Sequence, residues 1–315
     1  MNLFESGDNK IPPNPISGTV RTRDGITLRY AHWRTARPPA KGTVIILHGR
    51  TEFIEKYYET IQDLREAGYE ALTFDWRGQG GSDRLLANPR RGHVESFDQY
   101  VMDLDTILKE IALPDCRGPL FILAHSTGGL VALTAAPALG NRIERMVLTS
   151  PLIGFGEFGL SSGTLRFVTG LMCTAGLGSI PFSRKSSNAD ALRDFASNQV
   201  TSDTKRFTRN SEFLIEHDEL AIDGPTAGWL FAAGQAMRRI HDPDFIASIS
   251  VPTLLISAGS DTVVSNRAIE DYGKRLRSGR AVQVAGSKHE ILQERDVLRE
   301  QAMAAIKAFL PGNVS

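Results

Sequence analysis

The sequence is short of cysteine, of net charge and of long apolar runs. Its 315 residues contain two cysteines, Cys116 and Cys173. Two thiols cannot build a disulfide framework, and no metal-ligand spacing surrounds either one, so we expect two buried thiols in a reducing compartment. The 36 basic side chains balance 36 acidic ones, which removes the overall field that would recruit nucleic acid. We therefore expect no nucleic-acid partner and no metal.

Membrane and export signals are also scarce. Residues 1–16 contain acidic side chains and three prolines but lack the apolar core of a secretory signal. The stretch 118–141 has no charged residue and is long enough to span a bilayer. Its centre, however, holds the polar run 125–129, and Pro137 follows, which favours a strand and a small-residue helix buried in a protein core. The sequence predicts a cytoplasmic protein, with peripheral attachment to the inner face of the membrane as an alternative.

Short apolar runs alternate along the chain with longer segments of helical period. The predicted strands are 18–20, 26–30, 43–47, 70–74, 120–124, 146–149, 253–257 and 282–284. The predicted helices are 54–66, 97–111, 130–138, 266–276 and 291–309. Asp24-Gly25 between the first two runs is a hairpin signal. This alternation predicts an α/β fold whose central sheet is mostly parallel and covered by helices on both faces.

The alternation breaks within residues 154–249. The first part of this segment is rich in Gly, Leu and Phe, and the remainder has irregular helical patterns. We expect a helical cap inserted over the ends of the strands, with residues 1–153 and 250–315 forming one core. The apolar pattern of the segment is too weak to predict an independent domain.

Ser126 is the candidate nucleophile. An apolar strand runs into His125-Ser126-Thr127, and a helix rich in small residues follows. A strained turn between strand and helix needs small residues two positions before and after the nucleophile, and Ala124 and Gly128 occupy them. The segment departs from the G-x-S-x-G pattern by one methyl group. Ser126 as a simple helix N-cap is the alternative.

Asp261 and His289 are the candidate acid and base. Each follows a predicted strand near its carboxyl end, where active sites form in parallel sheets. The chain order of serine, acid and histidine is that of the strand-turn-helix serine hydrolases, and His289 is the one histidine after Asp261. Turn formation by Asp261 and a surface position for His289 are the alternatives.

Two backbone N–H groups are the candidate oxyanion hole. One belongs to Thr127, the residue after the nucleophile, and the other to Arg50, which follows the predicted strand 43–47. We expect His48 in the same loop to hold the loop by hydrogen bonding rather than to act as a base. With the serine, acid and histidine present, the sequence predicts a reaction that needs no cofactor.

Three motifs carry a resemblance to a known family. They are the run 75–82, the loop 48–57 and Gly92-His93-Val94. Together they resemble bacterial lysophospholipases, which stand beside the monoacylglycerol lipases in the α/β-hydrolase superfamily. The resemblance implies a capped α/β core that hydrolyses an acyl ester of a lysophospholipid or a monoacylglycerol. It implies the same catalytic residues. The lysophospholipase-like branch also has alanine at the position of Ala124. Asp75 precedes Ser126, and we expect it to hold a structural turn.

The cap is expected to supply an apolar substrate surface. Its apolar side chains are Phe155, Phe158, Leu160, Leu165, Phe167, Val168, Leu171 and Met172. They suit an acyl-chain tunnel or contact with a membrane surface, and ordinary packing against the core is the alternative. Phe155, Phe158 and, by analogy with the family, Trp229 are the predicted substrate contacts. A small lipid-like ester is the expected partner, and the sequence sets no oligomeric state.

Three other functions remain open. A general carboxylesterase would share every catalytic residue. An aminopeptidase on the same fold would need acidic groups in the cap to bind the substrate amine, and the acidic residues there are Glu212, Glu216, Asp218 and Glu219. Such a cluster more often forms a solvated face. A non-catalytic ligand-binding protein of this fold would have a broken triad.

Overall fold

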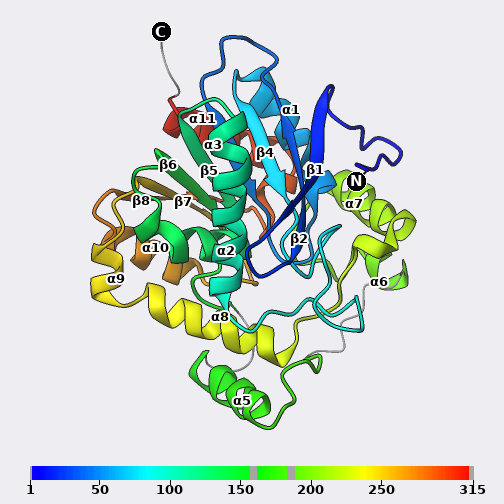
Figure 1. Cartoon of the computed structure of the whole chain (residues 1–315), viewed down its shortest axis with the longest axis vertical. Helices are drawn as coiled ribbons and strands as arrows, with labels where there is room; N and C mark the ends of the chain where they lie inside the picture. Colours follow the sequence, from blue (N-terminus) through cyan, green and yellow to red (C-terminus); the bar gives the residue numbers. More distant parts are fainter. Residues whose placement is uncertain (1, 157–161, 183–188, 312–315) are drawn as a thin grey trace.

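The central sheet has eight strands in the order β1-β2-β4-β3-β5-β6-β7-β8 (Figure 1). The computed structural model describes residues 2–156, 162–182 and 189–311, and this strand count refers to them. β2 runs antiparallel to β1 and β4, and every other pairing is parallel. The strands are β1 (Pro15–Arg21), β2 (Thr27–Trp33), β3 (Thr43–Leu47), β4 (Glu70–Phe74), β5 (Leu120–His125), β6 (Arg145–Thr149), β7 (Thr253–Ala258) and β8 (Gly279–Val284). The predicted α/β fold with a mostly parallel sheet is confirmed.

Helices follow most of the strands. The core helices are α1 (Tyr58–Glu66), α2 (Phe97–Ile107), α3 (Leu113–Asp115), α4 (Thr127–Ala135), α10 (Asn266–Arg275) and α11 (Asp296–Phe309). Short 3₁₀-helices are η1 (Ile54–Tyr57), η3 (Ala136–Ala138) and η5 (Ile291–Gln293), and a π-helical turn is η2 (Leu108–Ala112).

Four predicted helices differ from the observed ones. The helix expected at 54–66 is the 3₁₀ turn η1 followed by α1. The helix expected at 130–138 begins earlier, at Thr127, because tertiary packing overrides the low helical propensity of the two glycines that follow. The helix expected at 97–111 changes to π geometry before Pro114, whose ring cannot continue α-helical hydrogen bonds. The helix expected at 291–309 is a 3₁₀ turn followed by a separate helix, α11.

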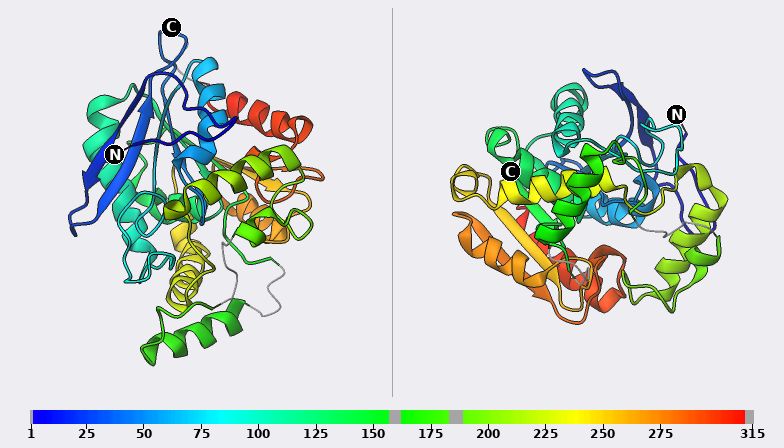
Figure 2. Two further views of the ribbon diagram at one scale, coloured as in Figure 1. Left: turned by 90° about the vertical axis from the view of Figure 1, so that its right-hand side faces the viewer. Right: turned by 90° about the horizontal axis from the view of Figure 1, so that it is seen from below.

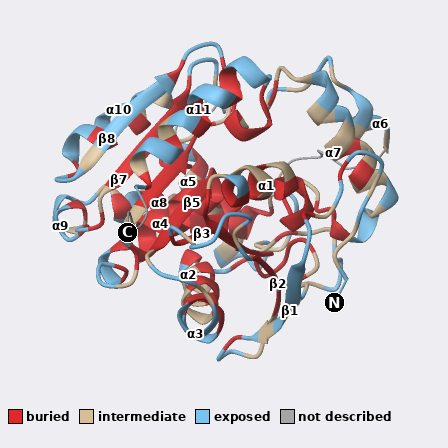
Figure 3. Ribbon diagram, turned by 90° about the horizontal axis from the view of Figure 1, so that it is seen from above, coloured by how far each residue is buried: buried red, intermediate tan, exposed pale blue. Residues whose placement is uncertain are grey.

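Alternate side chains of the central strands build two apolar layers, because successive residues of a strand face opposite sides of the sheet. On β3, Ile45 and Leu47 join the layer covered by α2, α4 and α10. Val44 and Ile46 join the opposite layer, covered by α1 and α11. The central strands are buried, whereas the edge strands β1 and β8 are largely exposed (Figure 3). The predicted strand 282–284, which we expect to be covered on both faces like the other apolar runs after residue 43, instead lies in the exposed edge strand β8.

The segment between β6 and β7 forms helices and, over its described residues, no strand of the sheet. These helices are α5 (Ser162–Thr174), α6 (Ala189–Arg193), α7 (Thr204–Glu216), η4 (Asp218–Leu220), α8 (Ala227–Ile240) and α9 (Pro243–Ala247). α8 contributes Leu230, Ala233 and Ile240 to the main apolar layer. α5 packs on α8, where Phe231 lies against Gly170, and is the outermost helix in Figures 1 and 2. The segment thus shares the core's apolar layer through α8.

A buried ion network fixes the amino-terminal strands to the loop after β4. Arg29 on β2 pairs with Glu55 at 2.7 Å and with Asp75 at 2.6 Å, and all three side chains are at most 1% exposed. Asp75 also accepts hydrogen bonds from the N–H groups of Ile54 and Gly81. Burial raises the pKa of Asp75, but the charge of Arg29, with the contacts to His48 and the Gly81 N–H, together lower the value to about 2. Asp75 therefore holds a turn, as the sequence predicted.

Replacing Arg29 tests this network. Arg29→Met leaves Glu55 and Asp75 buried without their cation, and we expect the free energy of unfolding to fall by about 3–5 kcal/mol, measured by urea denaturation. Arg267→Met, at a side chain that is 92% exposed, should change it by less than about 0.5 kcal/mol. Equal urea midpoints for the two variants would contradict a stabilising role for the network.

Candidate active site

Ser126, Asp261 and His289 meet at one edge of the sheet. They follow β5, β7 and β8, whose carboxyl ends lie side by side because these strands are parallel. His289 Nδ1 lies 2.8 Å from Asp261 Oδ2, and His289 Nε2 lies 3.0 Å from Ser126 Oγ. A carboxylate can only accept, so Nδ1 carries the proton in the neutral ring and Nε2 is left to accept from the serine hydroxyl. The serine is 8% exposed and the histidine 5%.

Ser126 has a strained backbone. Its φ of 51° and ψ of −112° lie outside the regions that residues with side chains usually adopt. The strain is held by three backbone hydrogen bonds, in which Ser126 donates to Thr149 and accepts from Leu130 and Leu152. A Cβ at Gly128 would lie 2.2 Å from the carbonyl oxygen of Leu47, so this position admits only glycine. Ala124, by contrast, fits within the buried sheet, and the extra methyl group is accommodated.

Asp261 is held as an anion. Its Oδ1 accepts hydrogen bonds from the N–H groups of Val263, at 2.8 Å, and Val264, at 3.1 Å. Burial raises the pKa of Asp261, but the hydrogen bond and charge of His289 and these two N–H groups together lower it below its ordinary value. The carboxylate is thus positioned to orient the histidine ring and to stabilise its charged form.

The loop after β3 leaves the backbone N–H of Arg50 free of hydrogen bonds to the described residues. Gly49 N–H donates to the Glu52 carboxylate, and Thr51 N–H donates to Gln79 at 2.9 Å. Thr127 is the first residue of α4, where N–H groups lack an acceptor in their own helix. Trp76 Nε1 donates to the carbonyl of His48 at 2.9 Å and fixes the start of the loop.

A buried charged chain joins this loop to the histidine loop. Lys56 Nζ lies 2.8 Å from Glu52 and 2.6 Å from Glu290, the residue after His289. Burial lowers the pKa of Lys56, but Glu290 and Glu52 outweigh it and raise the value to about 12. Burial likewise raises the pKa of Glu52, but the opposing effects, of which the charge of Lys56 is the largest, bring it below its ordinary range. This charged chain was not predicted: Glu52 and Lys56 have helical spacing, but nothing in the sequence links them to Glu290.

His125 lies beside the catalytic candidates without adding charge. Its ring centroid is 4.8 Å from that of His289, and its Nδ1 lies 3.1 Å from the carbonyl of Thr149. Burial lowers the pKa of His125 to about 4. The ring is therefore neutral near pH 7 and does not compete electrostatically with a proton on His289.

The three predicted substrate contacts do not share one environment. Trp229 is 4% exposed, and its Nε1 donates to Tyr100 Oη at 3.2 Å. Phe155 is half-buried and bridges to Val264 in the loop that carries Asp261. Phe158 lies outside the described residues.

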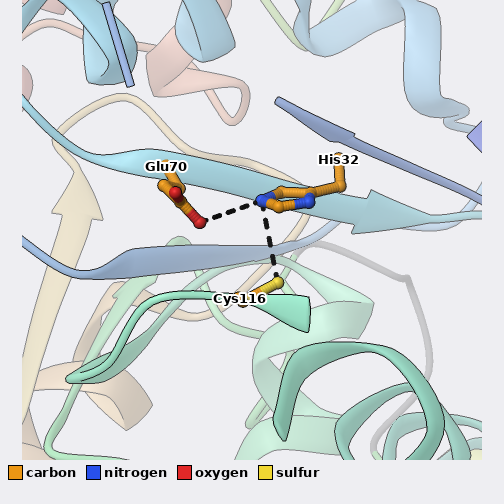
Figure 4. A group of neighbouring side chains, drawn as sticks. All are labelled: His32, Glu70 and Cys116. Carbon is orange, nitrogen blue, oxygen red and sulfur yellow. Dashed lines mark hydrogen bonds and ion pairs between the residues drawn. The ribbon is translucent and has the colours of Figure 1, made fainter. Parts of the chain in front are cut away.

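A second polar cluster brings together His32, Glu70 and Cys116 (Figure 4). His32 Nε2 lies 3.1 Å from Glu70 Oε2 and 3.7 Å from Cys116 Sγ. The carboxylate already accepts from Arg34 at 3.2 Å and from Arg117 N–H at 3.1 Å. Burial, followed by the Glu70 charge, raises the pKa of Cys116 to about 12, so the sulfur is a neutral thiol. An arginine on the carboxylate and a protonated thiol both favour a hydrogen-bonded support over a cation site.

This cluster was not predicted, because its members come from three distant segments. The expected burial of both thiols is also wrong, since Cys116 and Cys173 are half-buried. Cys116 packs against the main apolar layer and also lies against the polar pair of His32 and Glu70.

The sequence profile of the serine aminopeptidase S33 family matches residues 38–296. The chain belongs to this family. It is similar to lysophospholipase L2 of Escherichia coli K12, with 30% identity over 297 residues, 91% of this chain and 84% of the relative. It is also similar to the probable lysophospholipase L2 of Haemophilus influenzae, with 27% identity over 303 residues, 96% of this chain and 92% of the relative.

Solved structures support the same fold. A soluble variant of monoglyceride lipase from Saccharomyces cerevisiae, in complex with a substrate analog, superposes with a TM-score of 0.76 at 18% identity, covering 97% of this chain and 98% of that one. As a member of the S33 family, the chain is a serine hydrolase with the α/β-hydrolase fold. The resemblance to lysophospholipases and monoacylglycerol lipases is confirmed.

The charged chain beside the site can be tested at Lys56. Lys56→Met leaves Glu52 and Glu290 facing each other without a cation, and we expect the free energy of unfolding to fall by about 3–5 kcal/mol. The rate of labelling by a fluorophosphonate should fall as well, because both loops lose their tie. Lys274→Met, which removes a 66% exposed lysine paired with Glu270, is the matched control. Wild-type urea midpoints and labelling rates in both variants would show that the chain does not support the site.

Proposed function

We propose that the chain hydrolyses the acyl ester of a lysophospholipid or a monoacylglycerol through an acyl-enzyme on Ser126. The observation that carries this proposal is the continuous hydrogen-bonded path from Ser126 through His289 to Asp261. The similarity to enzymes named lysophospholipase L2 supports the lipid class.

In this mechanism, His289 Nε2 removes the hydroxyl proton as Ser126 Oγ attacks the ester carbonyl carbon. The Asp261 carboxylate stabilises the charged ring that results. The N–H groups of Thr127 and Arg50 bind the negative oxygen of the tetrahedral intermediate, which the amino-terminal end of α4 also favours. His289 then gives the proton to the departing alcohol. Water, deprotonated by the same nitrogen, releases the fatty acid and restores Ser126.

We assign residues 154–249 as the cap and residues 1–153 with 250–315 as the catalytic core. The cap assignment is supported by α8, which joins the core layer beneath α5. Trp229 on α8 and Phe155 beside the Asp261 loop remain proposed substrate contacts.

An aminopeptidase activity is less well supported. The acidic groups that would bind a substrate amine face solvent: Asp218 is 73% exposed and Glu219 is 58% exposed. Glu212 is exposed and pairs with Arg193. These side chains form the solvated face that such a cluster usually makes.

Active-site labelling tests the nucleophile. A fluorophosphonate should label the wild-type protein at Ser126, and Ser126→Ala should lose both the label and hydrolysis of 1-acyl lysophospholipid and monoacylglycerol. The matched control is Ser260→Ala, at an exposed serine next to Asp261, which should label like the wild type. Undiminished labelling of Ser126→Ala in an intact-mass spectrum would refute the assignment.

The outer face of α5 suits a lipid surface. Phe167 is 73% exposed and Leu171 is 64% exposed, and these two residues lie one helical turn apart. Nearby apolar side chains that are also exposed are Val168, Leu177 and Ile180. Among the described residues, no helix is both long and apolar enough to cross a bilayer. We therefore propose peripheral contact, with α5 lying in the membrane interface.

Vesicle binding tests this contact. The double variant Phe167→Ser with Leu171→Ser should bind vesicles of phosphatidylglycerol and phosphatidylethanolamine at least about ten-fold more weakly. The reason is that two apolar side chains are no longer transferred from water into the membrane interface. Co-sedimentation measures the bound fraction. Val297→Ser removes a side chain that is 63% exposed on α11 and should bind like the wild type. Unchanged binding of the double variant would exclude α5 as the contact.

A further inference from the structure

The guanidinium of Arg50 has an unusual environment beside the candidate oxyanion loop. Its Nη2 donates to the carbonyl oxygen of Asp223 at 2.8 Å, and its Cζ lies 5.3 Å from the centre of the Trp229 ring. Its Nε is inaccessible to solvent and has no hydrogen-bond partner. A charged donor that is hidden from water and has no acceptor costs free energy. A ligand that supplies the acceptor during function would remove this cost.

The charge of Arg50 is also not neutralised by a close ion pair. Among the described residues, no carboxylate lies within 4.0 Å of its guanidinium nitrogens. Burial lowers the pKa of Arg50 to about 10, against the weaker opposing effects of Tyr100 and Asp223. The side chain therefore carries a full positive charge at neutral pH and keeps a free donor.

Arg50 places its side-chain charge close to the proposed reaction, because its own backbone takes part in it. The backbone N–H of the same residue is the proposed donor to the ester oxyanion. In a lysophospholipid, the phosphate lies one glycerol unit from the reacting acyl carbon. The Arg50 guanidinium lies one side-chain length from the oxyanion donor, so the two separations are comparable. A planar guanidinium is well suited to phosphate oxygens, which it binds through parallel N–H groups.

We propose that the Arg50 side chain binds the phosphate of the substrate head group and thereby selects lysophospholipids over monoacylglycerols. This inference rests on the proposed ester hydrolysis and adds the head-group class. Monoacylglycerol has a hydroxyl where the lysophospholipid has an anion, so it gains little from a buried cation.

Arg84 provides a matched comparison. Its Nη2 donates to the carbonyl of Glu219, so it too ties the core to the segment 217–223 through a backbone oxygen. Its Nη1 donates to the carbonyl of Gly78, and its Nη2 also donates to the carbonyl of Gly80. If Arg50 served only as such a tie, the two arginines would respond alike to substitution.

The test is the ratio of kcat/KM for 1-acyl lysophosphatidylglycerol to that for monoacylglycerol of the same acyl chain. Arg50→Met should lower this ratio about 10- to 100-fold, as expected for a lost hydrogen bond to a charged group. Arg50→Lys should lower it less, because the charge remains without the planar fork. Arg84→Met should leave the ratio unchanged even if both rates fall.

A probe of the wild-type enzyme makes the test independent of folding of the variants. Glycerol 3-phosphate should inhibit monoacylglycerol hydrolysis competitively, whereas glycerol at the same concentration should not. An unchanged ratio in Arg50→Met, or equal inhibition by the two probes, would overturn the phosphate contact. Absence of hydrolysis of both lipids by the wild type would instead overturn the proposed function.

Discussion

The close approach of α4 to the end of β3 is the constraint on which the site depends. The helix begins so near the Leu47 carbonyl that no side chain fits at Gly128. This approach requires β3 and β5 to be neighbours, which the strand order provides. It also brings the start of α4, directly after the strained Ser126, close to the backbone of Leu47 and His48. One steric contact thus relates the position of the candidate nucleophile to that of the proposed oxyanion donors.

Buried charges hold the loops around this contact. The loops at the carboxyl edge of the sheet bury apolar side chains such as Ile54, Trp76 and Ile291, and two ion networks add polar ties to this packing. Arg29 ties the turn of Asp75 to Glu55, and Lys56 ties Glu52 to Glu290. Buried ion pairs add little stability compared with apolar packing, but their geometry is specific. Such specificity suits loops that must keep hydrogen-bond donors at fixed distances.

The sequence predicted the sheet and the candidate site more fully than the contacts around them. β3 and β4 were predicted to the residue, because continuous β-branched and aliphatic runs mark buried parallel strands. The chain order of Ser126, Asp261 and His289 was enough to select residues that the fold places in hydrogen-bonding contact. The start of α4 was missed because local propensity opposes it. The Lys56 chain was missed because Glu290 is separated from it by most of the sequence.

The positive charge of Arg50, beside the candidate oxyanion loop, would distinguish the candidate substrates by their own charge. A peptide with a free amino terminus brings a positive charge to the site, and the Arg50 guanidinium, as the proposed head-group contact, would repel it. A neutral monoacylglycerol is indifferent to that charge, whereas a phosphate diester is attracted. The exposed apolar side chains of α5 suit a substrate that leaves a lipid surface. The proposed membrane contact on α5 and the proposed phosphate contact at Arg50 would suit the two ends of one kind of molecule, a single acyl chain joined through glycerol to a phosphate.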